Sequence, residues 1–125
     1  MESESIARRL DIKHRCYSFS KNIILFINKN EFKRINYSIV DQLLRSSTSI
    51  GANVIEGKSG SSKKNLLYFF SVALRSANET KYWLCLIRDT FKIQKEEVNI
   101  LIKEANEISK IIAKSIITLK KGIEV

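Results

Sequence analysis

Apolar residues recur at helical spacing along almost the whole chain, in four stretches separated by short polar breaks. The stretches cover approximately residues 6–28, 36–56, 62–91 and 95–120. In the first stretch, steps of three and four place on one face Ile12, Cys16, Phe19, Ile23 and Phe26. The same spacing continues in the other three stretches. The pattern therefore predicts four amphipathic helices and an all-α fold.

The breaks between the stretches predict how these helices connect. Gly57 stands where a helix C-cap favours a left-handed residue, and Ser61 or Ser62 is a suitable N-cap for the next helix. The 125 residues contain no proline and only four glycines, which favours a few long helices over a sandwich or barrel. Short connections predict an up-down-up-down antiparallel four-helix bundle, with residues 1–125 as a single domain.

Some apolar side chains fall outside the faces that one bundle core needs. They occur on the two longest predicted helices and are Val72, Trp83, Leu86, Ile100 and Ile111. A bundle helix with apolar residues on two sides often contacts a second subunit as well as its own core. We therefore expect a homo-oligomer whose interface includes these residues.

The second predicted helix carries a polar stripe of short side chains. Steps of three and four place within about 60° of arc the side chains of Gln42, Ser46, Ser49, Asn53 and Glu56. A solvated face is one interpretation. Solvated faces elsewhere in the chain are rich in Lys and Glu, however, so hydroxyl and amide groups favour a partly buried polar seam between helices or between subunits. Arg45 could then pair with Glu56 of a neighbouring subunit.

The same helix resembles the signature of a known family. Residues 42–46 read QLLRS and residues 49–57 read SIGANVIEG, close to the pattern QLRRA..SI..NIAEG of proteins encoded in intervening sequences of bacterial 23S rRNA genes. The third-helix pattern of that family is also matched, at Ser62, Lys63, Lys64, Phe69, Ala73, Leu74, Ser76, Ala77, Glu79, Thr80 and Leu84. Two departures are Gly51, where the family often has proline, and Phe32-Lys33, where it often has Phe-Pro.

This resemblance implies a fold more than an activity. Relatives are up-down four-helix bundles, and some form homopentameric rings with a central opening. The matching motif residues, Arg45 and Gly57 among them, are expected to belong to the polar seam. A more distant similarity, to accessory proteins of diversity-generating retroelements, implies a basic pentamer that works with a reverse transcriptase and RNA.

The charge of the chain predicts a polyanionic partner. Twenty-two Lys and Arg against 13 Asp and Glu give a net charge of +9, which attracts nucleic acid over long range. Four cations cluster near the N-terminus at Arg8, Arg9, Lys13 and Arg15. A second set, which interleaves cations with aromatic rings on the third helix, comprises Lys63, Lys64, Tyr68, Arg75 and Tyr82. Such a stripe suits phosphates and stacked bases, although the tyrosines could instead pack on a neighbouring subunit.

The sequence offers little for catalysis, metal binding or a cofactor. His14 is the only histidine and stands between Lys13 and Arg15, while Cys16 and Cys85 fit small core residues. No apolar run approaches the roughly 18 residues of a membrane span, and we expect a cytoplasmic protein. The sequence favours a non-catalytic, RNA-binding homo-oligomer, and the family resemblance implies a pentamer. The alternative is a protein-interaction scaffold or accessory protein, for example a partner of a reverse transcriptase.

Overall fold

A computed structural model describes residues 11–60 and 62–124 of the chain. Within these ranges the chain forms four α-helices and one short 3-10 helix. Their bounds are α2 Ile12–Lys29, η1 Arg34–Asn36, α3 Tyr37–Ser59, α4 Lys63–Thr90 and α5 Lys95–Glu124. The all-α prediction is therefore confirmed over the described part of the chain.

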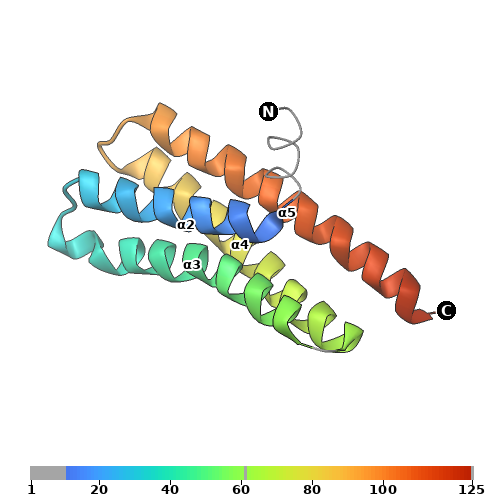
Figure 1. Ribbon diagram of the computed structural model, residues 1–125. Coiled ribbons are helices and arrows are strands. Elements are labelled where there is room, and N and C mark those ends of the chain that lie inside the picture. Colours follow the sequence, from blue (N-terminus) through green and yellow to red (C-terminus); the bar gives the residue numbers. More distant parts are fainter. Residues whose placement is uncertain (1–10, 61, 125) are drawn as a thin grey trace, which may run out of the picture.

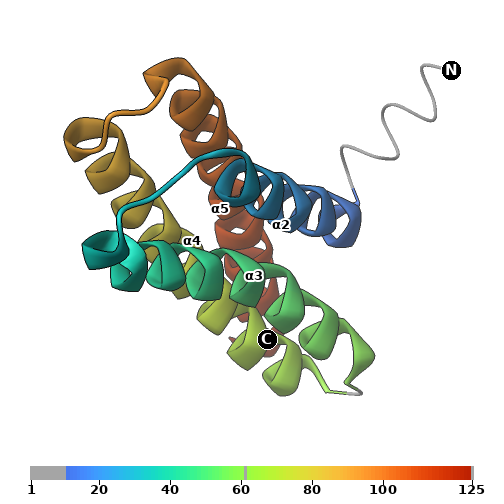
Figure 2. The ribbon, with the colours of Figure 1, turned by 90° about the vertical axis from the view of Figure 1, so that its left-hand side faces the viewer.

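The four helices pack side by side in an antiparallel bundle (Figures 1 and 2). Each helix contacts its neighbours along the chain, and α2 also contacts α5, so that the four form a closed square. The diagonal partners are α2 with α4 and α3 with α5. This arrangement confirms the predicted four-helix bundle.

The core is built from the faces that the apolar spacing predicts. All five residues of the predicted face on α2 are buried. On α5 the predicted positions Val98, Leu101, Ala105, Ile108 and Ile112 are buried as well. The predicted Leu119 is only half-buried, because it lies on the last turns of α5, beyond the N-terminal end of α2.

Side-chain caps define where two of the helices begin. The Asp11 side chain accepts a hydrogen bond from the His14 backbone N at 3.3 Å, and the Ser62 side chain accepts one from the Asn65 backbone N at 3.0 Å. Ser62 is thus the N-cap of α4, one of the two predicted candidates. The predicted first helix begins at residue 6, but residues 6–10 lie outside the described ranges.

The predicted helix end at Gly57 is wrong. The α3 helix continues to Ser59, and no glycine in the described ranges has a positive φ. Gly57 instead allows a close approach of α3 and α4. A Cβ atom added there would lie 3.1 Å from the Cβ of Phe69 and 3.3 Å from Cδ1 of Leu66, so these side chains would have to shift by a few tenths of an ångström.

One end of the bundle is closed by aromatic rings, and we call it the aromatic end. Phe32, in the connection between α2 and η1, makes edge-to-face contacts with Phe26 of α2 and with Phe91 at the end of α4. An ion pair between Lys29 and Glu97 joins α2 to α5 at the same end. The two connections at this end are therefore fixed to the helices that they join.

Candidate functional site

The polar stripe of α3 lies partly inside the bundle, against α4. Hydroxyl oxygens of Ser46 and Thr80 are hydrogen-bonded at 3.0 Å, and so are those of Ser49 and Ser76. Asn53 donates from Nδ2 to Ser49 Oγ at 2.9 Å. Among the described residues every buried side-chain nitrogen and oxygen has a hydrogen-bond partner. These short side chains form a satisfied polar seam that lets α3 and α4 approach closely.

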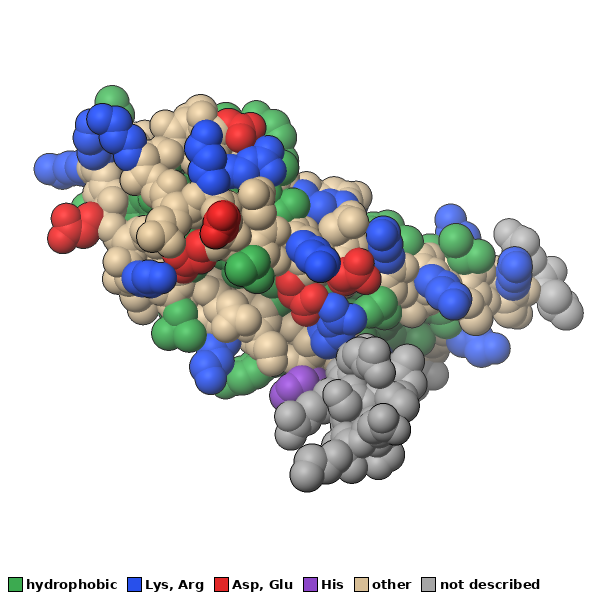
Figure 3. Space-filling model, turned by 90° about the horizontal axis from the view of Figure 1, so that it is seen from above, with side chains coloured by type: hydrophobic (Ala, Val, Ile, Leu, Met, Phe, Trp, Pro, Cys, Tyr) green, Lys and Arg blue, Asp and Glu red, His purple; other side chains and the backbone are tan. Residues whose placement is uncertain are grey.

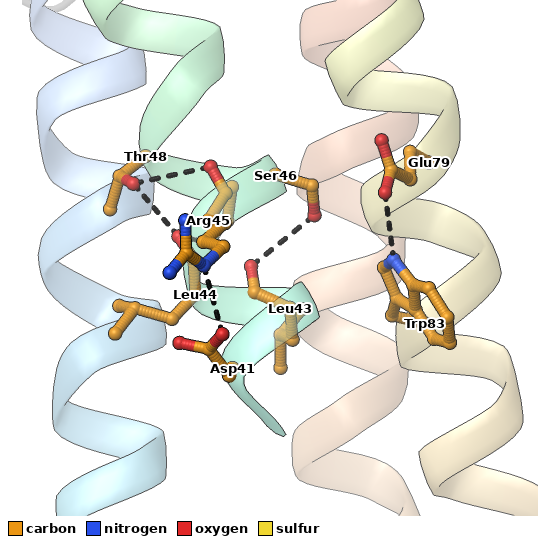
Figure 4. A network of polar contacts seen from close by, with 9 residues as sticks. Asp41, Leu43, Leu44, Arg45, Ser46, Thr48, Glu79 and Trp83 are labelled. Atoms are coloured by element: carbon orange, nitrogen blue, oxygen red, sulfur yellow. Dashed lines mark hydrogen bonds and ion pairs between the residues drawn. The ribbon is translucent and has the colours of Figure 1, made fainter. Parts of the chain in front are cut away.

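The remaining members of the stripe face solvent. Gln42 and Glu56 are exposed, so the seam is shorter than the sequence predicts. Arg45 is also exposed, and its Nε donates to Asp41 one turn earlier at 2.8 Å (Figure 4). Figure 4 also shows Ser46 on the side of α3 that faces the neighbouring helices, whereas Arg45 points away from them. Within one chain Arg45 is therefore paired with Asp41.

Lysines from all four helices gather at the end of the bundle opposite the aromatic end. We call this the basic end and define it by Lys13, Lys58, Lys63, Lys64 and Lys114. A cleft of about 470 Å³ brings three of them together with Gly57, Gly60, Ser62 and Leu66. None of the five makes an ion pair with a described carboxylate. In Figure 3 the narrow end formed by α5 shows Lys and Arg, with the acidic side chains of that face gathered elsewhere.

Two helix N-termini and two helix C-termini meet at this end, so their dipoles largely oppose one another. The first turns of α2 and α4 each contain lysine and no acidic residue, although the Asp11 carboxylate caps α2. The N-terminus of a helix carries about half a positive charge, so lysine in the first turn opposes the helix dipole by roughly 0.3–1 kcal/mol. Lys63 and Lys64 thus occupy positions that cost stability, whereas an anion bound there would be favoured.

An exposed stripe of cations and rings runs along α4 from the basic end. Lys64, Tyr68, Arg75 and Tyr82 share one face, and all four are exposed. Tyr68 makes an edge-to-face contact with Phe69, and Tyr82 makes one with Trp83, with ring centroids 5.1 and 5.0 Å apart. These contacts support each tyrosine on a half-buried ring while 60% and 61% of the two residues stay accessible.

Arg15 does not join the other predicted cations. Its guanidinium donates to both carboxylate oxygens of Glu104 on α5, from Nε at 3.2 Å and also from Nη2. This hydrogen bonding raises the pKa of Arg15 further above its ordinary value. Arg15 therefore fastens α2 to α5, while Lys13 remains exposed. Arg8 and Arg9 of the same predicted cluster lie outside the described residues.

The five apolar residues predicted at an oligomer interface do not form one surface. Val72, Trp83 and Leu86 are half-buried along one side of α4, where Trp83 Nε1 donates to Glu79 at 3.2 Å. Ile100 is 69% exposed and lies beside Leu25 of α2. Ile111 lines a different groove on α5, so three separate apolar areas are present.

The described residues contain no arrangement typical of a metal centre. In residues 11–60 and 62–124, no three His, Cys, Asp or Glu side chains come close enough to hold an ion. His14 is exposed, and burial raises the pKa of the Cys16 thiol to about 12, which keeps it protonated. None of the described helices has the length and apolar character that crossing a bilayer requires.

Sequence reasoning missed Lys58 and Lys114 as partners of Lys13 and Lys63. These residues are far apart in sequence, on α3 and α5, and only the bundle topology brings them to one end. One signal was available: in an up-down bundle the ends of the second and fourth helices meet the starts of the first and third. Lysines at those four positions are therefore expected to converge.

The chain is similar to known proteins in both sequence and fold. A family model described as 23S rRNA-intervening sequence protein matches residues 8–114. A crystal structure of a protein with unknown function from the S23 ribosomal protein family of Bacteroides thetaiotaomicron is 31% identical, with a TM-score of 0.74. The match covers 84% of this chain and 97% of that chain. No curated protein matches this sequence.

Proposed function

This chain belongs to the 23S rRNA-intervening sequence protein family, and we propose that it is a non-catalytic, RNA-binding member that acts as a homo-oligomer. The observation that carries the proposal is the basic end, where lysines occupy helix N-termini against the helix dipole. Residues that reduce stability in this way are best explained by a ligand that they attract. A polyanion is the ligand that such a surface favours.

The α4 stripe supports RNA in an extended form. Tyr68 and Tyr82 are separated by fourteen residues, which is about 21 Å along a helix, with Arg75 midway between them. An extended strand could stack bases on the two rings while Arg75 and Lys64 contact its phosphates. Stacking on aromatic side chains tolerates any base, so we expect affinity with little sequence preference.

Assembly would strengthen these contacts. Each subunit of a ring repeats the basic end and the α4 stripe, so weak contacts to one long RNA add through avidity. The separate apolar areas around Trp83 and Ile100 supply surface for subunit contacts. A homopentamer is the form that the family resemblance implies. Light scattering tests the assembly, and a 14.4 kDa particle at micromolar concentration would contradict it.

RNA binding is tested by fluorescence anisotropy with a short labelled single-stranded RNA over a range of salt concentrations. Affinity should fall steeply with salt, and the double variant Lys64→Glu/Arg75→Glu should weaken binding at least about tenfold. Lys103→Glu/Lys110→Glu is the charge-matched control, since both lysines are exposed on α5, away from the stripe. Equal affinity for both variants, or affinity independent of salt, would refute the proposal.

A protein partner is the second candidate, favoured by the exposed apolar side chains Tyr17, Ile24, Leu25 and Ile100 on α2 and α5. The intervening-sequence family match gives no support to the reverse-transcriptase role that the more distant resemblance implies. A complex that persists after nuclease treatment, together with no RNA affinity at low salt, would favour this candidate over RNA.

A further inference from the structure

A groove at the basic end lies between α5 and the adjoining ends of α3 and α4. It has a volume of about 550 Å³. Its apolar surface comes from Leu66 and Phe70 of α4 and from Ile111 and Leu119 of α5. Phe70 is buried, while the other three are half-buried. This combination leaves a continuous apolar area accessible from outside the bundle.

The groove exists because the four helices differ in length. The α2 helix has 18 residues and begins at Ile12, whereas α5 has 30 residues. Figure 1 shows the C-terminal part of α5 continuing past the N-terminal end of α2. Beside these last turns of α5 lie α4 and the end of α3. In the described part of the chain, no fourth helix covers the apolar surface between them. The groove therefore has the apolar character of a surface that a further bundle helix would cover.

The polar edges of the groove carry one sign of charge. Lys58 borders it on the α3 side and Lys114 on the α5 side, and among the described residues no acidic side chain lines it. Lys63 extends the positive edge, since its Nζ lies 3.6 Å from the position that a Cβ on Gly122 would occupy. An occupant must therefore combine an apolar face with acidic flanks.

We propose that this groove binds an acidic amphipathic helix of a protein partner. Ile111 and Leu119 are eight residues apart, about 12 Å along α5, which accommodates two turns of a docked helix. Apolar anchors spaced three or four residues apart would pack on Leu66, Phe70 and Leu119. Flanking carboxylates would meet Lys58 and Lys114. The inference goes beyond RNA binding and does not depend on it, because the apolar side chains of the groove offer neither charge nor hydrogen bonds to a phosphate backbone.

The test uses the full chain and a labelled helical peptide with leucines at i, i+4 and i+7 and glutamates elsewhere. We expect saturable binding by fluorescence anisotropy. A peptide of the same composition with the leucines scattered around the helix should bind at least about tenfold more weakly. Failure of the amphipathic peptide to bind, or equal binding of the two peptides, would overturn the proposal.

Matched substitutions on α5 locate the contact. Leu119→Ser removes a groove residue and should weaken peptide binding about tenfold, whereas Ile117→Ser, outside the groove and 56% exposed, should leave binding unchanged. Lys114→Glu should weaken binding and Lys110→Glu should not. Circular dichroism checks that each variant is folded. Equal effects within either pair would place the peptide elsewhere and overturn the proposal.

Two parallel measurements separate this inference from the other possible occupants. RNA affinity should be the same in Leu119→Ser as in the unchanged chain, and its loss would assign the groove to RNA. Light scattering should give the same mass for Leu119→Ser, since a change would assign the groove to a second copy of this chain. Either result overturns the helix-binding proposal, while absence of RNA binding in every variant contradicts only the proposed function.

Discussion

The two ends of the bundle consist of similar helices but differ in how their side chains are paired. At the aromatic end, Phe32 joins Phe26 to Phe91, and Lys29 is paired with Glu97. At the basic end, lysines stand at helix N-termini without described carboxylate partners, beside an apolar groove. Aromatic contacts and ion pairs at one end stabilise the fold, whereas the other end keeps unpaired charge and accessible apolar surface. This difference supports the proposal that binding takes place at the basic end, while the aromatic end stabilises the fold.

The largest expected effect is on stability at the aromatic end. Phe32→Ala removes both edge-to-face contacts and should lower the free energy of unfolding by about 2–3 kcal/mol. Leu119→Ala at the basic end should cost less than about 1 kcal/mol, because Leu119 is half-buried and no described helix covers it. Urea denaturation measures both. Equal losses would remove the contrast between the ends.

A second prediction concerns the burial of the Cys16 thiol in the core near the basic end. Cys16 of α2 is buried, and burial raises the pKa of its thiol to about 12 from the usual value of 9.0. The folded state therefore resists ionisation of Cys16. This contribution to the free energy of unfolding is fully present below pH 9 and is lost as the pH rises toward 12. The loss amounts to about 2 kcal/mol by about pH 10.5.

The matched variant for this prediction is Cys16→Ala, which should lose less stability than the unchanged chain over the same alkaline range. Urea denaturation at several pH values gives the difference. Half-buried Cys85 provides a control within the chain, because it should react with a thiol reagent in the folded state while Cys16 should not. Two equally reactive thiols would mean that the bundle is open around Cys16.

A smaller effect separates paired from unpaired cations. Arg15→Gln breaks the hydrogen bonds to Glu104 and should reduce stability by about 1 kcal/mol, with RNA affinity unchanged. Lys13→Gln, two residues earlier, should weaken RNA binding, while stability stays constant or rises slightly because a cation is removed from the first turn of α2. Unfolding curves and RNA anisotropy on both variants test this prediction. It would be contradicted if Arg15→Gln lost RNA affinity and Lys13→Gln lost stability instead.

The fold follows from the sequence because helical spacing is a local property. The face of Ile12, Cys16, Phe19, Ile23 and Phe26 predicts its own burial, since a 3.6-residue period aligns these positions whatever they pack against. The polar seam could be predicted for the same reason, but only in part. The stripe identifies Ser46, Ser49 and Asn53 without indicating that Ser76 and Thr80 complete it from α4.

The errors arise where a neighbouring helix decides the outcome. The sequence predicts a helix end at Gly57, whereas in the fold Gly57 lies inside α3 and packs closely against Phe69 of α4. The sequence predicts that Arg15 is an unpaired cation, whereas in the fold it pairs with Glu104, which is far away in the sequence. Long-range contacts of this kind leave no periodic trace in the sequence. The basic end is a similar case, because its lysines come from four helices.

The central claim is that Lys63 and Lys64 serve binding at the expense of stability. The most direct test is the double variant Lys63→Glu/Lys64→Glu, measured by both urea denaturation and RNA anisotropy. The free energy of unfolding should stay constant or rise by up to about 1 kcal/mol, because glutamate suits a helix N-terminus. RNA affinity should fall at least about tenfold, and the salt slope should shrink by about 1.5. Unchanged RNA affinity, or a less stable protein, would contradict the claim.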